Sequence, residues 1–269
     1  VAINFSFLPV PIVWILSIAG AFIFGAAWAF IPAYLQAKRG SHIVITTIMF
    51  NFIASSLMVY LLVDVIRDMK QMGPHTVALP KELWLPSFKD LAALFGIKIR
   101  YSPLNASFLL AIAASFFVWF LVWKTKWGYE MRAVGHNTQA AIYAGISPYK
   151  NIIIAMLISG GLAGLLSINE ILGVHHKIVS GFPAGYGFTG IAVALMGRNH
   201  PIGIFPAAFL FGILYQGGSE VTFDMPNITR YMFVAVQGVI ILFSGALENL
   251  FRPQIESFFV NRINREAVV

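Results

Sequence analysis

Long apolar stretches without charge are the feature that most constrains how this chain folds. No Lys, Arg, Asp or Glu occurs between His42 and Val63, and comparable stretches recur along the sequence. A bilayer's hydrocarbon core is about 30 Å thick and is crossed by about 20 apolar residues in a helix, which satisfies its own backbone hydrogen bonds. Only 11% of the 269 residues are charged, whereas a soluble domain carries about a quarter. The chain is therefore predicted to be an integral membrane protein.

The hydrophobic pattern predicts an all-α, polytopic membrane bundle with about seven segments. Two of the segments, both in the last third, are too short to cross the core as one helix. Short, Gly- and Pro-interrupted segments are tolerated at membrane depth where protein or a water-filled cavity covers the backbone. This region is thus predicted to line a passage or to pack against a partner. The segments cover about residues 12–30, 42–63, 106–123, 152–172, 185–197, 204–216 and 232–247.

Residues 1–269 are predicted to form a single membrane domain with two long polar connections, 64–105 and 124–150. Alternating spans place these connections on opposite sides, and the side that holds 124–150 carries slightly more Lys and Arg. The positive-inside rule therefore favours a cytoplasmic 124–150 loop and an external 64–105 loop. Basic residues are scattered over both sides, so the net charge of +7 indicates topology rather than nucleic-acid binding. The chain starts at Val1 without a signal peptide, and we expect an N-terminal truncation.

The polar run Glu130–Ile146 lies between two predicted spans and contains one predicted short helix. Asn137 or Thr138 can cap its start, residues 139–144 form its body, and Gly145 can end it in a left-handed turn.

Ala140, Ala141 and Ala144 give that helix a small, flat face at spacing i, i+1 and i+4. A small-faced helix held between two spans predicts a surface on which a soluble partner pushes or pulls. The alternative is an ordinary connecting loop.

The chain offers little chemistry of its own. It has no Cys, no Ser-His-Asp order, no HExxH and no phosphate-binding loop, so we expect no metal, no cofactor and no catalysis. His175 and His176 are neighbours that point about 100° apart on a helix, which favours interfacial loop residues over metal ligands. Glu170 is the only acid near the interior of a predicted span, and we expect it to snorkel to the interface. This scarcity of buried carboxylates argues against a proton- or sodium-coupled carrier.

Apart from Glu170, the polar residues within the spans are uncharged. Thr47 and Asn51 can hydrogen-bond a neutral polar solute, although such residues also join helices to one another. Tyr186 and Phe188 can stack on a base or a sugar ring, or they can serve as packing residues.

Three blocks resemble the permease subunits of bacterial ABC importers of the ribose/simple-sugar family. The first, Lys38–Asn51, is similar to the family's glycine followed by a "VIxTLMxN" helix, and the second, Arg132–Ile146, to its "RAxGxNxxAAxxxGI" loop. The third, Gly185–Pro201, is closer to the nucleoside-type branch, because the ribose branch has a Gly-Gly-rich turn where this chain has Arg198-Asn-His-Pro.

The resemblance implies an ATP-driven importer of a nucleoside or simple sugar in the bacterial cytoplasmic membrane. Implied partners are a cytoplasmic ATPase, a second and related permease subunit, and an extracytoplasmic substrate-binding lipoprotein that meets the 64–105 loop. Charge reversal at Arg132 or a bulky residue at Ala141 is then expected to uncouple ATP hydrolysis from transport. The implied ATPase-coupling residues are Arg132, Gly135, Asn137, Ala140, Ala141, Ala144, Gly145 and Ile146. The implied substrate pathway contains Thr47, Asn51, Tyr186, Phe188 and Thr189.

Three other functions remain open at this point. A branched-chain amino-acid permease would need charged groups for a zwitterion, and the spans supply few. A passive channel or facilitator for small neutral solutes would need no ATPase. A membrane-embedded enzyme is disfavoured because no cluster of catalytic residues lies at one depth.

Overall fold

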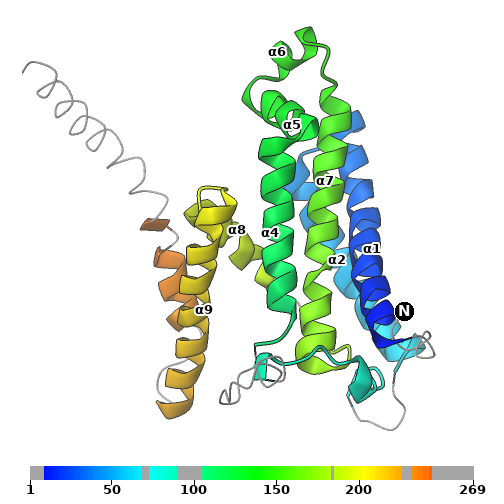
Figure 1. Cartoon of the computed structure of the whole chain (residues 1–269), viewed down its shortest axis with the longest axis vertical. Coiled ribbons are helices and arrows are strands. Elements are labelled where there is room, and N and C mark those ends of the chain that lie inside the picture. Colours follow the sequence, from blue (N-terminus) through cyan, green and yellow to red (C-terminus); the bar gives the residue numbers. More distant parts are fainter. Residues whose placement is uncertain are drawn as a thin grey trace, which may run out of the picture. The chain divides into compact units, whose positions relative to one another are not determined.

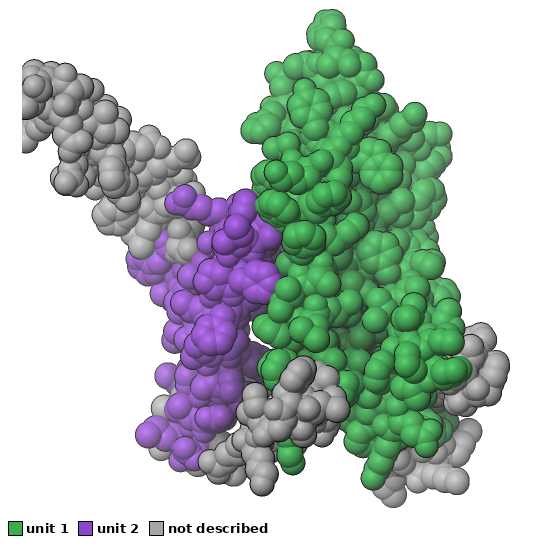
Figure 2. All heavy atoms as spheres, viewed as in Figure 1, with its two compact units in different colours: residues 1–182 green, residues 183–269 purple. Residues whose placement is uncertain are grey.

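The structure is a computed structural model that describes residues 9–67, 73–89, 104–182, 185–225, 232–240 and 242–243. Within these ranges the chain is helical, with two isolated β-bridges and no β-strand, which confirms the predicted all-α class. Two compact units, residues 1–182 and 183–269, are distinguished by colour in Figure 2. Among the described residues, five helices are long and apolar enough to cross a membrane: Val10–Arg39, Ile43–Val65, Ser107–Lys124, Pro148–His175 and Pro201–Thr222.

In unit 1, four of these helices run alongside one another (Figure 1). Two of them change to a π-helix at the same end of the unit: α2 (Ile43–Tyr60) continues as η1 (Leu61–Val65), and α7 (Pro148–Gly164) continues as η3 (Ile168–His175). The other two are α1 (Val10–Arg39) and α4 (Ser107–Lys124).

Glycines allow α1 and α7 to pack backbone against backbone. A Cβ added to Gly25 would overlap the carbonyl oxygen of Gly160, and one added to Gly164 would overlap that of Ala21. Small residues four apart on one helix permit this approach, which is the usual way that membrane helices gain contact area without a hydrophobic driving force. The α1–α7 contact is the most extensive one between helices in unit 1.

Residues 73–89, which we call the strap, cross the end of unit 1 at which the π-helices lie. The strap contains the short 3-10 helix η2 (Lys81–Leu83). The indole N–H of Trp14 donates to the carbonyl of Leu83 (3.0 Å), which ties the strap to α1. Leu79 joins Ile168 and Leu172 of η3 in a buried cluster, so the strap is part of the core of unit 1.

Unit 2 contains α8 (Tyr186–Met196) and α9 (Pro201–Asp224), joined by a tight turn. The backbones approach closely, because a Cβ on Gly197 would lie 2.6 Å from the amide nitrogen of Ile204. Residues 232–240 are also helical. Within the described part of unit 2, Ala192, Val193, Ala207 and Phe211 form a buried core cluster.

The prediction that 204–216 is too short to cross a membrane is wrong, since α9 has 24 residues. The helix continues through Gly218, although a glycine costs about 1 kcal/mol there relative to alanine. Side chains support the added turns: Gln216 donates to Glu220 (3.0 Å), and Thr222 donates to the carbonyl of Gly218 (2.8 Å). The neighbouring prediction of a short helix over 185–197 is confirmed by the 11 residues of α8.

Candidate functional site

Two helices connect α4 to α7, at the end of unit 1 opposite to the strap (Figure 1). They are α5 (Lys126–His136) and α6 (Thr138–Tyr143). One short helix was predicted here, and α5 is an additional helix that was not predicted.

The start of α5 is fixed by Thr125. Its hydroxyl accepts the amide of Gly128 (3.2 Å) and donates to the carbonyl of Leu121 (2.6 Å). A Cβ on Gly128 would overlap carbonyl groups of α4, so a glycine lets α5 fold back closely on that helix. The signal that could have identified α5 is this threonine cap ahead of apolar residues at helical spacing, Trp127, Met131 and Val134.

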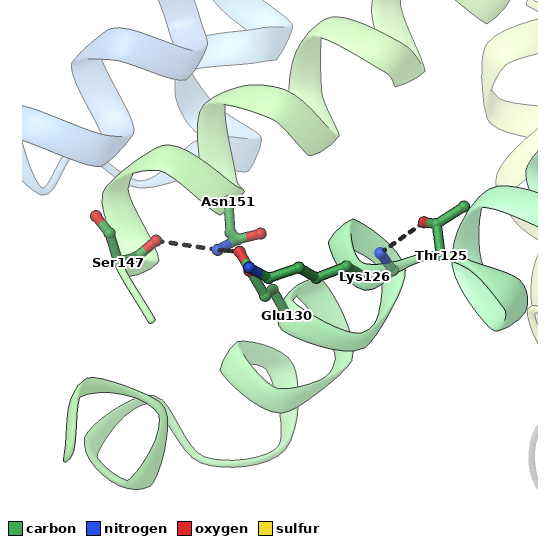
Figure 3. A network of polar contacts seen from close by, with 6 residues as sticks. Thr125, Lys126, Glu130, Ser147 and Asn151 are labelled. Carbon is green, nitrogen blue, oxygen red and sulfur yellow. Dashed lines mark hydrogen bonds and ion pairs between the residues drawn. The ribbon is translucent and has the colours of Figure 1, made fainter. Parts of the chain in front are cut away.

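A polar network holds α5 on the first turn of α7 (Figure 3). The side-chain amide of Asn151 donates to Glu130 Oε2 (3.4 Å) and to the carbonyl of Ser147 (3.1 Å). Lys126 Nζ lies 3.9 Å from the other carboxylate oxygen of Glu130. Asn151 is buried, and sequence reasoning missed it, because its partner lies on another helix. The network makes the position of α5 depend on that of α7.

Both ends of α6 are closed as predicted. The side-chain oxygen of Asn137 accepts the amide of Ala140 (3.0 Å), which identifies Asn137 rather than Thr138 as the cap. Gly145 adopts a φ of 77°, and the next amide, that of Ile146, donates to the carbonyl of Ala141 (2.9 Å). This is a helix end of the Schellman type.

The exposed face of α6 differs from the predicted one. Ala141 is only 3% exposed and therefore packs against its own chain, whereas Ala140 and Ala144 are exposed. Successive residues of a helix point about 100° apart, so Ala140 and Ala141 do not share the middle of one face. Tyr143, which the sequence analysis did not single out, is 92% exposed. At spacing i, i+3 and i+4 it lies on one face with the two exposed alanines. We call Ala140, Tyr143 and Ala144 the α6 face.

Arg132 and Gly135 lie in α5, and both are exposed. A Cβ added to Gly135 would meet nothing within 4 Å, so neither contact nor crowding explains a glycine there. All the predicted coupling residues thus lie in α5, α6 and the turn that follows them.

The predicted pathway residues of unit 1 belong to a polar stripe on α2. Thr47, Asn51 and Ser55 follow at spacing i, i+4 and i+8, and α2 has no buried residue. The Thr47 hydroxyl donates to the carbonyl of Ile43 (2.9 Å). Asn51 and Ser55 are exposed, and their side chains make no hydrogen bond to another described residue. Polar groups at membrane depth need water, a solute or another helix as partner.

The other predicted pathway residues lie at the start of α8, in unit 2. The ring of Tyr186 lies 6.5 Å from that of Tyr215 on α9, while Phe188 and Thr189 are exposed. The pathway residues therefore come from two units, and their shared role remains a prediction.

Glu170 does not snorkel to the interface as predicted. It is only 6% exposed, accepts a hydrogen bond from the side-chain amide of Asn169 (3.0 Å), and lies 3.5 Å from the imidazole of His175. These partners make burial of the carboxylate tolerable. Burial lowers the pKa of the neighbouring His176. A hydrogen bond to the backbone of Leu172 partly offsets this shift, and the nearby His175 adds to it.

Comparison with known proteins identifies the family. Residues 3–245 match the family described as the permease component of the branched-chain amino acid transport system. The chain belongs to this permease family. Membership confirms the predicted resemblance and the prediction of a transport component rather than an enzyme, and the five long apolar helices confirm a multi-pass membrane protein.

Several curated relatives of this permease are similar over most of its length. The guanosine ABC transporter permease protein NupP of Bacillus subtilis is 36% identical over 222 residues, which are 81% of this chain and 61% of the relative. The glucose permease TsgB13 of Haloferax volcanii is 32% identical over 266 residues (98% and 69%). The nucleoside permease NupB of Lactococcus lactis is 34% identical over 251 residues (87% and 65%). The chain thus spans about two thirds of these relatives. No solved structure matches it significantly.

Proposed function

We propose that the chain is the transmembrane subunit of an ATP-driven importer that moves a nucleoside or simple sugar across the bacterial cytoplasmic membrane. The observation that carries this proposal is α6, a helix closed at both ends that holds an exposed tyrosine between two small residues. A rigid aromatic side chain flanked by alanines suits insertion into a pocket of a partner protein.

The nature of the polar stripe on α2 supports a neutral substrate. Asn51 and Ser55 offer amide and hydroxyl groups without charge, which suit the hydroxyls of a sugar or a ribose. Glu170, the buried carboxylate of unit 1, is already engaged by Asn169 and His175. A zwitterionic amino acid would lack a charged partner on this stripe. The relatives named for guanosine, nucleosides and glucose favour the same class of substrate.

The mechanism that we propose is alternating access driven from the cytoplasm. Closure of an ATPase pair would displace the α6 face and with it α5, which the Glu130–Asn151 contact joins to α7. Movement of α7 would then open the passage to one side or the other. Coupling would involve Arg132, Gly135 and the α6 face, and the pathway would be lined by the α2 stripe and the start of α8.

The proposed assembly contains the ATPase, an extracytoplasmic substrate-binding lipoprotein and a second permease. Two guanosine permeases of B. subtilis, NupP and NupQ, are both similar to this chain, which favours a related but distinct second subunit.

Affinity purification of the tagged full-length protein from its native membrane tests this assembly. Recovery of an ATPase, a second permease and a binding lipoprotein is expected. A protein that purifies alone, and that allows passive flux of nucleosides in liposomes, would instead be a facilitator.

The α6 face is tested by Tyr143→Ala, which should reduce recovery of the ATPase and nucleoside uptake at least tenfold, as expected of an aromatic hot spot. Tyr60→Ala is the matched control, because Tyr60 is also exposed but lies at the end of α2 next to η1. Equal recovery of the ATPase with both variants would remove the α6 face from the coupling site.

A further inference from the structure

The contact between Glu170 and His175 depends on the π-helix in which both lie. Glu170 Oε2 and His175 Nε2 are 3.5 Å apart, although five residues separate them. A π-helix repeats its contacts at i, i+5 and brings such residues together. In an α-helix the same residues would lie about 140° apart around the axis and about 7.5 Å apart along it. The contact therefore exists only in the π register.

The strap also binds to features of the π register. The carbonyl of Leu172 accepts the amide of Leu85 (3.0 Å), whereas in an α-helix that carbonyl would accept the amide of His176. The carbonyl of His176 in turn accepts the amide of Leu79 (2.8 Å). The imidazole of His176 stacks on Trp84 of the strap, with ring centroids 3.7 Å apart. A return of η3 to the α register would remove these contacts together.

A chain of hydrogen bonds holds the other side of η3. The side-chain oxygen of Asn169 accepts from Asn105 (3.2 Å) and from the Ser107 hydroxyl (2.7 Å), and its amide donates to Glu170. These residues position the Glu170 carboxylate, and their contacts do not depend on the register that the helix adopts beyond residue 170. The contact between Glu170 and His175, by contrast, does depend on that register.

An open apolar pocket beside η3 leaves its side chains loosely enclosed by the rest of the chain. The pocket has a volume of about 260 Å³ and is bordered by Ile171 of η3, by Ile178 and Phe182 beyond it, and by residues of η1. A well-packed interior resists rotation of a side chain as large as isoleucine, whereas a side chain beside a cavity can move without overpacking.

We propose that η3 is a two-register switch, that the Glu170–His175 contact locks it in the π register, and that the strap binds only to that register. Loss of the contact lets the residues beyond Glu170 rotate by about 100°, the angle of one residue, and releases the strap. The helix α7 carries Asn151 near its start and continues as η3 at its other end. The strap at one end of unit 1 is therefore linked through this helix to Asn151 at the opposite end. This switch does not depend on the identity of the transported solute.

Hydrogen exchange of the strap, measured by mass spectrometry on the full-length protein in nanodiscs, tests the lock. E170Q and H175Q should each speed exchange at the amides of Leu79 and Leu85 by about tenfold or more, because a contact to a charged group is lost. E220Q is the matched control, since it makes the same chemical change on α9, where the carboxylate bonds to Gln216, and should leave the strap unchanged. The His175 side chain is 42% exposed, so H175Q decides the question if E170Q does not fold.

Two double variants separate the register from the loss of charge. The exchange E170H/H175E keeps the pair at i, i+5 and should restore protection of the strap to within about threefold of the parent. V174H/H175V moves the histidine to i+4, the spacing of an α-helix, and should leave the strap as exposed as H175Q does. The proposal is overturned if the single variants protect the strap as the parent does, if the exchanged pair fails to restore protection, or if the histidine at position 174 retains it.

Discussion

Replacement of Gly25 by alanine probes the contact that joins α1 to α7. The new methyl group would overlap the carbonyl oxygen of Gly160 and lie 3.1 Å from the Cα of Gly164. Both neighbours are backbone atoms of a helix, so no side chain can rotate away to relieve the overlap. The two helices would have to separate along their whole contact.

The size of the effect follows from two opposing contributions. Alanine is favoured over glycine within a helix by about 1 kcal/mol, whereas inserting a methyl group into a filled contact costs about 1–3 kcal/mol. Gly135→Ala isolates the first contribution, because a Cβ on Gly135 meets nothing within 4 Å. Gly25→Ala should therefore be less stable than Gly135→Ala by about 1–3 kcal/mol.

Thermal unfolding of the purified full-length protein in lipid nanodiscs, followed by tryptophan fluorescence, measures this difference. We expect Gly25→Ala to unfold at a lower temperature than the parent, and Gly135→Ala to unfold at the same temperature or slightly above it. A Gly25→Ala protein that is as stable as Gly135→Ala would show that direct backbone packing does not hold α1 on α7.

Three further predictions concern the ends of the helices and the α2 stripe. Asn137→Ala removes the cap of α6 and should weaken that helix by about 1 kcal/mol, seen as faster hydrogen exchange at Ala140, whereas Asn137→Asp should keep the protection. Burial lowers the pKa of His176, so its neutral form is favoured in the folded state and stability should fall as pH drops below 6.5, its ordinary value. His176→Asn, which suits the left-handed backbone there (φ 53°), should reduce the loss of melting temperature between neutral and mildly acidic pH. Under the proposed function, Asn51→Leu should abolish nucleoside uptake while the proposed ATPase still co-purifies, and Phe52→Leu, at an exposed neighbour, should transport normally.

The membrane helices could be predicted because their cause is local: a run of apolar residues in lipid has few alternatives to a helix. The caps of α6 could be predicted for the same reason, since Asn137 and Gly145 act on backbone groups a few residues away. The length of α9 was predicted wrongly because Gly217 and Gly218 lower helix propensity, while the supporting side-chain bonds are visible only once the helix exists.

Contacts from distant segments decided the features that sequence reasoning missed. A pattern of alanines does not reveal which side of a six-residue helix packs, so the burial of Ala141 was not foreseen. The π register of η3 occurs together with hydrogen bonds from amides of the strap, which comes much earlier in the chain, and with a Glu170–His175 contact at spacing i, i+5 that an α-helical pattern does not predict. Glu170 was expected at the interface because its burial depends on a contact with His175 at spacing i, i+5 and on the position of Asn169, which Asn105 and Ser107 near the start of α4 hold in place.

The packing of α7 determines how movement at α6 would be transmitted. In its middle, α7 packs closely against α1 through glycine backbones, with the Phe22 ring of α1 against Gly161, so we expect the two helices to move as one body. At its first turn, Asn151 joins α7 to α5, and beyond its last turn η3 is bound to the strap. A displacement of α5 is therefore not absorbed by bending within the α1–α7 pair, and η3 is the part of this helix with an alternative register. The π-helix is thus where we expect a movement that begins at α6 to become a change in backbone structure.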